Sequence, residues 1–173
     1  MSPRLCRRFA FWLLLIAVTT AWGSARGAEQ PLFSFVQVTD THLTAGKPTE
    51  KVRNAIDDIN LLEPQPQFTV VTGDLLNGPK PKASTRLYME LFSRLRSPHF
   101  SVYGNHDDRK AYEKLVGEFN YSFDVPPYHF IVLDSVAKPA KETYGGRFSK
   151  RTISWLENHL TKVSKGVPII VFS

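Results

Sequence analysis

The sequence is almost without cysteine, since Cys6 is the only one among 173 residues. Cys6 lies near the N-terminus, in a stretch that we predict to be removed from the mature protein. The rest of the chain can therefore form no disulfide, and it offers no thiolate as a nucleophile or metal ligand. Any catalysis or metal binding must use histidine, carboxylate, amide or hydroxyl groups.

The sequence also lacks an apolar run long enough to cross a membrane. Its most apolar segment, Phe9 to Trp22, has 14 residues and includes two threonines, whereas a transmembrane helix needs about 20. Arg4, Arg7 and Arg8 precede this segment, and Ala25-Arg26-Gly27 follows as a small-x-small cleavage site. We predict a signal peptide over residues 1–27, a periplasmic or secreted protein, and no membrane attachment after cleavage. A retained membrane anchor is the alternative.

A basic region typical of nucleic-acid binding is missing as well. The formal net charge is +6, from 22 lysines and arginines against 16 acidic residues. Four of the arginines lie in the predicted leader, and without them 18 basic residues face 16 acidic ones, a net charge of +2. We therefore expect no nucleic-acid partner. The sequence does not specify an oligomeric state.

The remaining chain alternates between short apolar strands and amphipathic helices, which is typical of an α/β protein. Strands are predicted over residues 32–39, 68–72, 100–103, 128–133 and 167–172, and helices over 49–62, 84–96, 109–119 and a segment after Ser149. Thr49 and Ser149 are the predicted N-caps, and residues 138–147 are expected to form a loop. This order predicts βαβ units and a mainly parallel sheet buried on both faces, in one domain of residues 28–173.

Each of the first three predicted strands ends in residues that commonly bind metal ions. Asp40-Thr-His42 follows the first strand, Gly73-Asp74 the second, and Gly104-Asn-His-Asp107 the third. Asp40 and His42 are two residues apart, so in an extended segment they would point to the same side. Asp-x-His and Gly-Asp alone are common, and Gly-Asn-His-Asp, although more specific, could be a polar loop. All three at strand ends, where open α/β sheets bind their ligands, predict a functional site.

The residue types in these motifs favour a centre of two metal ions. If Asp40 and Asp74 meet at one sheet edge they repel each other unless a cation is bound. Asn105 adds a neutral amide oxygen. Two divalent ions about 3.5–4 Å apart could hold a phosphoryl group and generate hydroxide from water near neutral pH. Manganese, iron and zinc all suit oxygen and imidazole ligands.

The three motifs resemble the first three motifs of the calcineurin-like metallophosphoesterase superfamily. The stretch from Gly146 to Glu157 is similar to the segment before the fourth motif in its cyclic-nucleotide-phosphodiesterase-like and purple-acid-phosphatase-like branches. The resemblance covers essentially all of the chain after the predicted leader. It implies an α/β fold, a four-layer αββα sandwich with two β-sheets between helices, and two bound metal ions of manganese, iron or zinc.

The resemblance also implies a role for individual residues. Asp40 and His42 would bind the first metal, Asp74 would bridge both metals, and Asn105 would bind the second. His106 would contact the phosphate and assist the leaving group, so that His106 and Asp74 are the predicted catalytic residues. A metal-bridging hydroxide would attack phosphorus in a small phosphate mono- or diester.

The family pattern continues beyond the residues present here. It adds a lone histidine and a Gly-His-x-His motif, which hold the remaining three metal ligands, whereas this sequence ends at Ser173. His99, His129 and His159 are predicted to be structural, with His159 on the exposed face of a helix. We therefore expect a domain incomplete at its C-terminus. Two hypotheses follow, a fragment of an exported phosphoesterase or an exported chain without catalytic competence, and a nuclease is a less favoured third.

Overall fold

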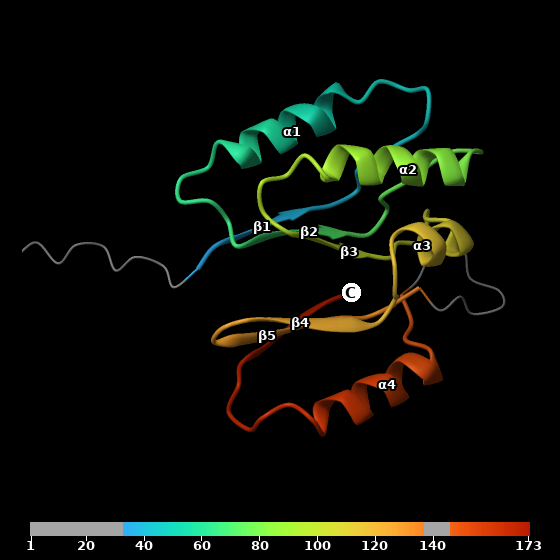
Figure 1. The fold of residues 1–173 in the computed structure, drawn as a ribbon. Coiled ribbons are helices and arrows are strands. Elements are labelled where there is room, and N and C mark those ends of the chain that lie inside the picture. Colours follow the sequence, from blue (N-terminus) through green and yellow to red (C-terminus); the bar gives the residue numbers. More distant parts are fainter. Residues whose placement is uncertain (1–32, 137–145) are drawn as a thin grey trace, which may run out of the picture. The chain divides into compact units, whose positions relative to one another are not determined.

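The computed structural model describes residues 33–136 and 146–173. The predicted signal peptide and nearly all of the loop predicted over residues 138–147 lie outside the described residues. The described residues form two three-stranded β-sheets with helices on their outer faces (Figure 1). None of the helices in these ranges is both long enough and apolar enough to cross a bilayer.

The first sheet consists of β1 (Phe35–Val38), β2 (Phe68–Thr72) and β3 (His99–Val102), all parallel and in the order β1-β2-β3. Helix α1 (Glu50–Asn60) connects β1 to β2, and α2 (Pro81–Phe92) connects β2 to β3. A short helix, α3 (Arg109–Leu115), follows β3. Parallel neighbouring strands need a crossover connection, and the two helices provide it here. The predicted βαβ units are therefore confirmed for this half of the chain.

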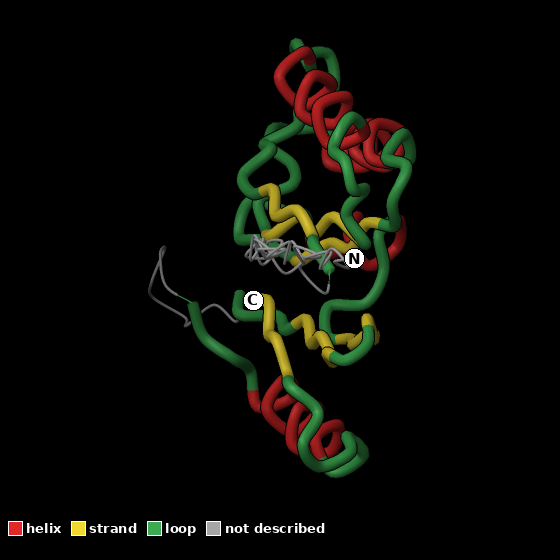
Figure 2. Tube along the Cα trace, turned by 90° about the vertical axis from the view of Figure 1, so that its left-hand side faces the viewer, coloured by secondary structure: helices red, strands yellow, loops and turns green. Residues whose placement is uncertain are grey.

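The second sheet consists of β4 (Tyr121–Val125), β5 (Tyr128–Val132) and β6 (Ile169–Phe172). Strands β4 and β5 form an antiparallel hairpin, and β6 pairs with β5 in parallel after a crossover through α4 (Lys150–Leu160). The prediction of one mainly parallel sheet is wrong because it leaves out β4. The two sheets between helices that the family resemblance implies are present, and Figure 2 shows these layers from the side.

The two sheets face each other across a core made mostly of phenylalanine. Phe35 stacks on Phe68 with ring centroids 4.9 Å apart, and Phe68 meets Phe130 of the other sheet at 5.0 Å. Phe123 in turn stacks on Phe130 at 5.0 Å. Because alternate residues of a strand point to opposite faces, each strand contributes every second side chain to this core. The contacts explain why the strands are rich in aromatic residues.

A second core lies between the first sheet and its helices. Ile56 and Ile59 of α1 are buried, as are Tyr88, Leu91 and Phe92 of α2. They pack in one cluster with residues that follow β1 and β2. The amphipathic pattern predicted for these two helices is therefore confirmed at these positions, whereas Leu62, at the end of the predicted first helix, is 45% exposed and lies beyond α1.

Helix boundaries differ from the predicted ones where local chemistry decides them. Helix α2 begins at Pro81, three residues earlier than predicted, because proline is well suited to the first turn of a helix. Helix α3 begins at Arg109 as predicted but ends at Leu115, four residues early. Gly117, with a backbone φ of 144°, follows it and cannot continue a helix.

The two predicted N-caps have different outcomes. The Ser149 hydroxyl accepts a hydrogen bond of 3.0 Å from the Thr152 N–H, so this cap is confirmed. Thr49 is the N-cap residue of α1, as predicted, but within the described residues its side chain caps no helix N–H. The Thr49 hydroxyl instead accepts a hydrogen bond of 2.9 Å from Nε of Arg53. A side-chain donor one turn along the helix thus replaces the backbone donor.

Candidate metal centre

The carboxyl ends of β1, β2 and β3 form the edge at which the predicted site residues lie. Backbone pairing continues beyond the strands themselves. The His42 N–H donates to the Asp74 carbonyl at 3.0 Å, and the Leu43 N–H donates to the Leu75 carbonyl at 2.9 Å. The Gly73 N–H donates to the Val102 carbonyl at 3.1 Å. Backbone hydrogen bonds therefore hold the three loops in place.

Three residues of this edge have a left-handed backbone conformation although none is glycine. The φ angles are 54° at Asp40, 43° at His42 and 49° at Asp74. Such angles are uncommon for residues with a Cβ, and each costs on the order of 1–3 kcal/mol. The extended geometry expected from Asp40 to His42 is therefore wrong, and the two side chains meet because the backbone bends. Clustered backbone strain of this kind is typical of functional sites.

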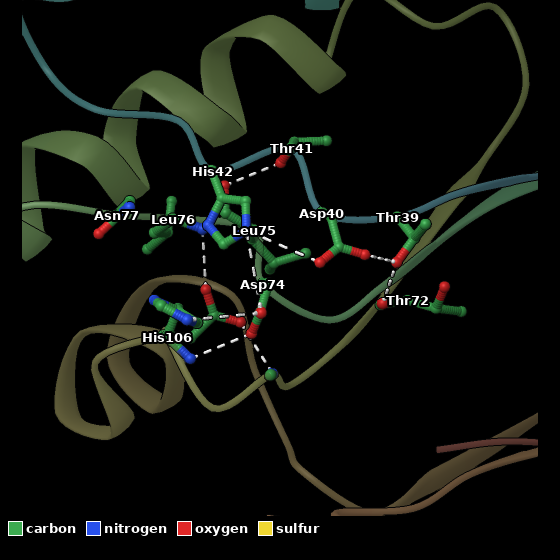
Figure 3. A network of polar contacts seen from close by, with 12 residues as sticks. Thr39, Asp40, Thr41, His42, Thr72, Asp74, Leu75, Leu76, Asn77 and His106 are labelled. Atoms are coloured by element: carbon green, nitrogen blue, oxygen red, sulfur yellow. Dashed lines mark hydrogen bonds and ion pairs between the residues drawn. The ribbon is translucent and has the colours of Figure 1, made fainter. Parts of the chain in front are cut away.

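The side chains of Asp40, His42 and Asp74 converge at this edge (Figure 3). Nε2 of His42 lies 3.7 Å from Oδ1 of Asp40 and 4.0 Å from Oδ2 of Asp74. One ligand atom from each residue lies within 4.8 Å of the others. An ion with bonds of about 2.0–2.2 Å joins ligand atoms that are roughly 3–4 Å apart. The three side chains thus fit around one metal ion after small adjustments.

The two ring nitrogens of His42 have different surroundings. Nδ1 of His42 is buried and has no hydrogen-bond partner among residues 33–136 and 146–173. Nε2 faces the two carboxylates and is the nitrogen that can coordinate an ion. One imidazole and two carboxylates are a donor set that manganese, iron and zinc all accept.

His106 adds a second imidazole beside this cluster. Its backbone N–H donates a hydrogen bond of 3.0 Å to Oδ1 of Asp74, and its Nε2 lies 4.0 Å from Oδ2 of the same carboxylate. The rings of His42 and His106 meet edge to face, with centroids 4.9 Å apart. The Asp74 side chain is 16% exposed and that of His106 is 43% exposed. Asp74 is therefore the inner residue of the pair, and His106 is open to a solute.

Asn105 has a different position. It is exposed in the turn between β3 and α3. In the described part of the chain, no hydrogen bond connects its side chain with Asp40, His42 or Asp74. The structure therefore brings four of the five predicted site residues together and leaves Asn105 next to His106, facing solvent.

Asp107 is a site residue to which the sequence assigns no role, although it ends the Gly-Asn-His-Asp motif. It is 5% exposed, and its carboxylate accepts hydrogen bonds from the Leu76 N–H at 2.9 Å and the Gly104 N–H at 2.8 Å. Burial raises the pKa of Asp107 to about 6, and these N–H groups oppose the rise because they stabilise the charged form. Asp107 thereby joins the loop after β2 to the loop after β3.

A small polar recess adjoins the centre. Its volume is about 270 Å³, and His106 and Asp107 line it together with Leu76, Asn77, Gly78, Pro81 and Asp108. His106 therefore lies between the converging ligands and a space that can admit a small group.

Two β-sheets between helices, with aspartate and histidine side chains at the ends of parallel strands, define an α/β protein with a candidate metal centre. A family model described as calcineurin-like phosphoesterase matches residues 33–172. The chain belongs to the calcineurin-like phosphoesterase family, as its three motifs predict.

Two curated relatives are phosphodiesterases by name. The chain is 28% identical over 152 residues to a "probable cyclic nucleotide phosphodiesterase" of Rhodopseudomonas palustris, an alignment covering 80% of this chain and 55% of the relative. It is 30% identical over 145 residues to a "probable glycerophosphodiester phosphodiesterase" of Arcobacter nitrofigilis, covering 73% of this chain and 51% of the relative. The chain thus spans about half the length of these relatives.

Solved structures show a weaker likeness. A protein of unknown function from Aquifex aeolicus aligns with a TM-score of 0.41 and 15% identity, covering 79% of this chain and 88% of the other. A single mutant of Vps29 from Entamoeba histolytica aligns with a TM-score of 0.41 and 10% identity, covering 79% and 72%. Neither alignment bears on function.

Proposed function

We propose that this protein is an exported, metal-dependent phosphoesterase that hydrolyses phosphate esters, with diesters preferred. The observation that supports the proposal most directly is the convergence of Asp40, His42 and Asp74 beside His106, in a chain of the calcineurin-like phosphoesterase family. The preference for diesters rests on the names of the two curated relatives.

In this proposal the metal ligands are those that the sequence predicts. Asp40, His42 and Asp74 would hold one ion, and the second oxygen of Asp74 together with Asn105 would contribute to a second. When bound, such ions supply Lewis acidity toward phosphoryl oxygens and lower the pKa of nearby water. The Asp74 carboxylate accepts a hydrogen bond from the His106 N–H and faces Nε2 of His42. These two contacts hold it in the centre of the site.

His106 would act on the substrate itself. The hydrogen bond from its backbone to Asp74 fixes its position, while its imidazole is 43% exposed and borders the small recess. An imidazole at this place can donate a hydrogen bond to a phosphate oxygen and pass a proton to the leaving oxygen. Asp107 would only position the two loops, because both of its carboxylate oxygens accept hydrogen bonds from backbone N–H groups.

The test is a hydrolysis assay with the purified chain, stripped of metal and then supplied with Mn²⁺. We expect metal-dependent cleavage of bis(p-nitrophenyl) phosphate that exceeds cleavage of p-nitrophenyl phosphate. Asp74→Asn should lower kcat/KM about a hundredfold, which corresponds to about 3 kcal/mol. Asparagine tolerates the left-handed backbone at this position, so the fold should persist. Asp58→Asn, an exposed position on α1, is the matched control and should leave kcat/KM unchanged.

Each contrary outcome has a defined meaning. Full activity of Asp74→Asn, or activity that survives metal removal, would contradict the proposed chemistry. Metal binding without any turnover would support the alternative hypothesis of a chain that is not catalytically competent. Export is tested separately by mass spectrometry of the protein secreted from a bacterial host, in which the proposal requires an N-terminus at Ala28.

A further inference from the structure

Two histidines meet on the outer face of the second sheet, away from the three loops of the candidate metal centre. His129 lies in β5 between Tyr128 and Phe130, which point into the core between the sheets. His129 therefore points to the opposite face, which α4 covers (Figure 1). His159 lies in α4, and its Nε2 is 2.8 Å from Nε2 of His129. This contact contradicts the prediction that His159 is simply exposed.

A carboxylate fixes the orientation of the inner histidine. Oδ1 of Asp124, on the neighbouring strand β4, lies 2.6 Å from Nδ1 of His129. An ionised carboxylate only accepts hydrogen bonds, so in the neutral ring of His129 the proton lies on Nδ1 and the lone pair on Nε2. That lone pair is directed at His159. The inner histidine is thus oriented as a metal ligand with a carboxylate behind it.

We propose that His129 and His159 form a second metal site, which binds a divalent transition cation such as Zn²⁺. Two imidazoles on one tetrahedral zinc ion lie about 3.3 Å apart, given Zn–N bonds of about 2.0 Å. A small rotation of the half-buried His159 ring reaches this separation from the present 2.8 Å. Water would complete the coordination, because His159 is only partly buried.

The surroundings of His159 support the site. Its ring stacks on Trp155 with centroids 4.8 Å apart and planes 4° apart, which limits its motion. Asp124 attracts a cation at this place and Lys162 repels one.

The chemistry of the pair selects the type of ion and the effect of binding. Imidazole nitrogen suits zinc, copper and nickel, whereas manganese and magnesium favour oxygen ligands. A bound ion would join α4 to β5 and so stabilise the packing of this helix on the sheet. The proposal does not depend on the proposed function, because the two sites share no residue.

The test is calorimetric titration of Zn²⁺ into the full-length, tag-free chain. The parent protein carries Asp40→Asn and Asp74→Asn, so that the first centre binds as little zinc as possible. We expect one zinc ion per chain. Adding His159→Gln should abolish this binding, and adding Asp124→Asn should weaken it about tenfold, as expected for a carboxylate behind a ligating histidine. Adding Lys162→Gln should tighten it several-fold.

Further variants separate a metal site from a hydrogen bond between two histidines. His99→Gln, at a histidine outside both sites, is the control and should leave zinc affinity unchanged. Circular dichroism checks that each variant is folded. Equal zinc affinity with and without His159→Gln would overturn the proposal, as would a folded parent protein that binds no zinc. A loss of phosphoesterase activity alone would not affect it.

Discussion

The backbone of Gly104 packs directly against Asp74, so that a Cβ atom at position 104 would overlap both the backbone nitrogen and Oδ1 of Asp74. The same Cβ would lie 2.8 Å from the carbonyl carbon of Gly73. These neighbours are mostly backbone atoms that the sheet holds in place. The loops after β2 and β3 can therefore meet only if residue 104 has no side chain, and the candidate metal centre depends on this contact.

Replacing Gly104 with alanine should separate the two loops. We expect Gly104→Ala to lower the free energy of unfolding by about 1–3 kcal/mol, the usual range for overpacking, and to weaken Mn²⁺ binding. Urea denaturation and calorimetry measure the two effects. Gly146→Ala is the control, because its Cβ would meet only the Ser135 carbonyl oxygen at 3.6 Å. A Gly104→Ala protein with unchanged stability would show that the loops can move apart freely.

Metal binding at the first centre should stabilise the folded chain. At a free Mn²⁺ concentration 100 times the dissociation constant, the expected gain is about 2.7 kcal/mol. The thermal unfolding midpoint should rise on adding Mn²⁺ and fall again with EDTA. Asp40→Asn should remove most of this shift, whereas Asp58→Asn should retain it. An equal shift in both variants would place the bound ion elsewhere.

The aromatic core between the sheets should dominate stability. Phe68 is 1% exposed and meets phenylalanines of both sheets. Phe68→Ala should therefore cost about 3–5 kcal/mol in the free energy of unfolding, because it removes buried apolar surface and leaves a cavity. Phe148, which is 41% exposed, is the matched position, and Phe148→Ala should cost less than about 1 kcal/mol. Similar costs at both sites would contradict this account of the core.

One histidine outside both candidate sites should make stability depend on pH. Burial lowers the pKa of His99, which lies beside the rings of Tyr88 and Phe92. The unfolded chain takes up a proton at this position below a pH of about 6.5, and the folded chain resists it. The stability that His99 contributes is therefore present above that pH and is lost as the pH falls through the lowered pKa.

Replacing His99 removes this proton uptake. The fall in unfolding free energy between pH 7 and pH 5 should be smaller in His99→Gln than in the parent chain. Urea denaturation at the two pH values measures the difference. An unchanged pH dependence would mean that His99 is protonated equally easily in both states.

Strong local signals made much of the fold predictable. The apolar run of β2 predicts its bounds correctly, and the spacing of Ile56 and Ile59 predicts the buried face of α1. Strand β4 was missed although Tyr121, Phe123 and Val125 alternate with polar residues, which is the pattern of a half-buried strand. Without β4, the hairpin that begins the second sheet is missing, and one sheet replaces two.

The candidate site was likewise predictable only in part. The motifs name Asp40, His42, Asp74 and His106, because carboxylates and imidazoles after successive strands are a local pattern. Their convergence depends on the left-handed backbone at three positions, which hydrogen bonds between the loops impose. The role of Asp107 was not predictable either, since its partners Gly104 and Leu76 come together only when both loops are folded.

The sequence by itself determined the family, the residues of the candidate metal centre and most of the helices and strands, because these depend on short motifs and on local periodicity. The tertiary structure alone decided which distant side chains meet. His129 and His159 are 30 residues apart and belong to a strand and a helix, and no local pattern relates them. Packing of α4 on the second sheet brings their rings to 2.8 Å, which turns two separate histidines into a pair that can bind a metal ion.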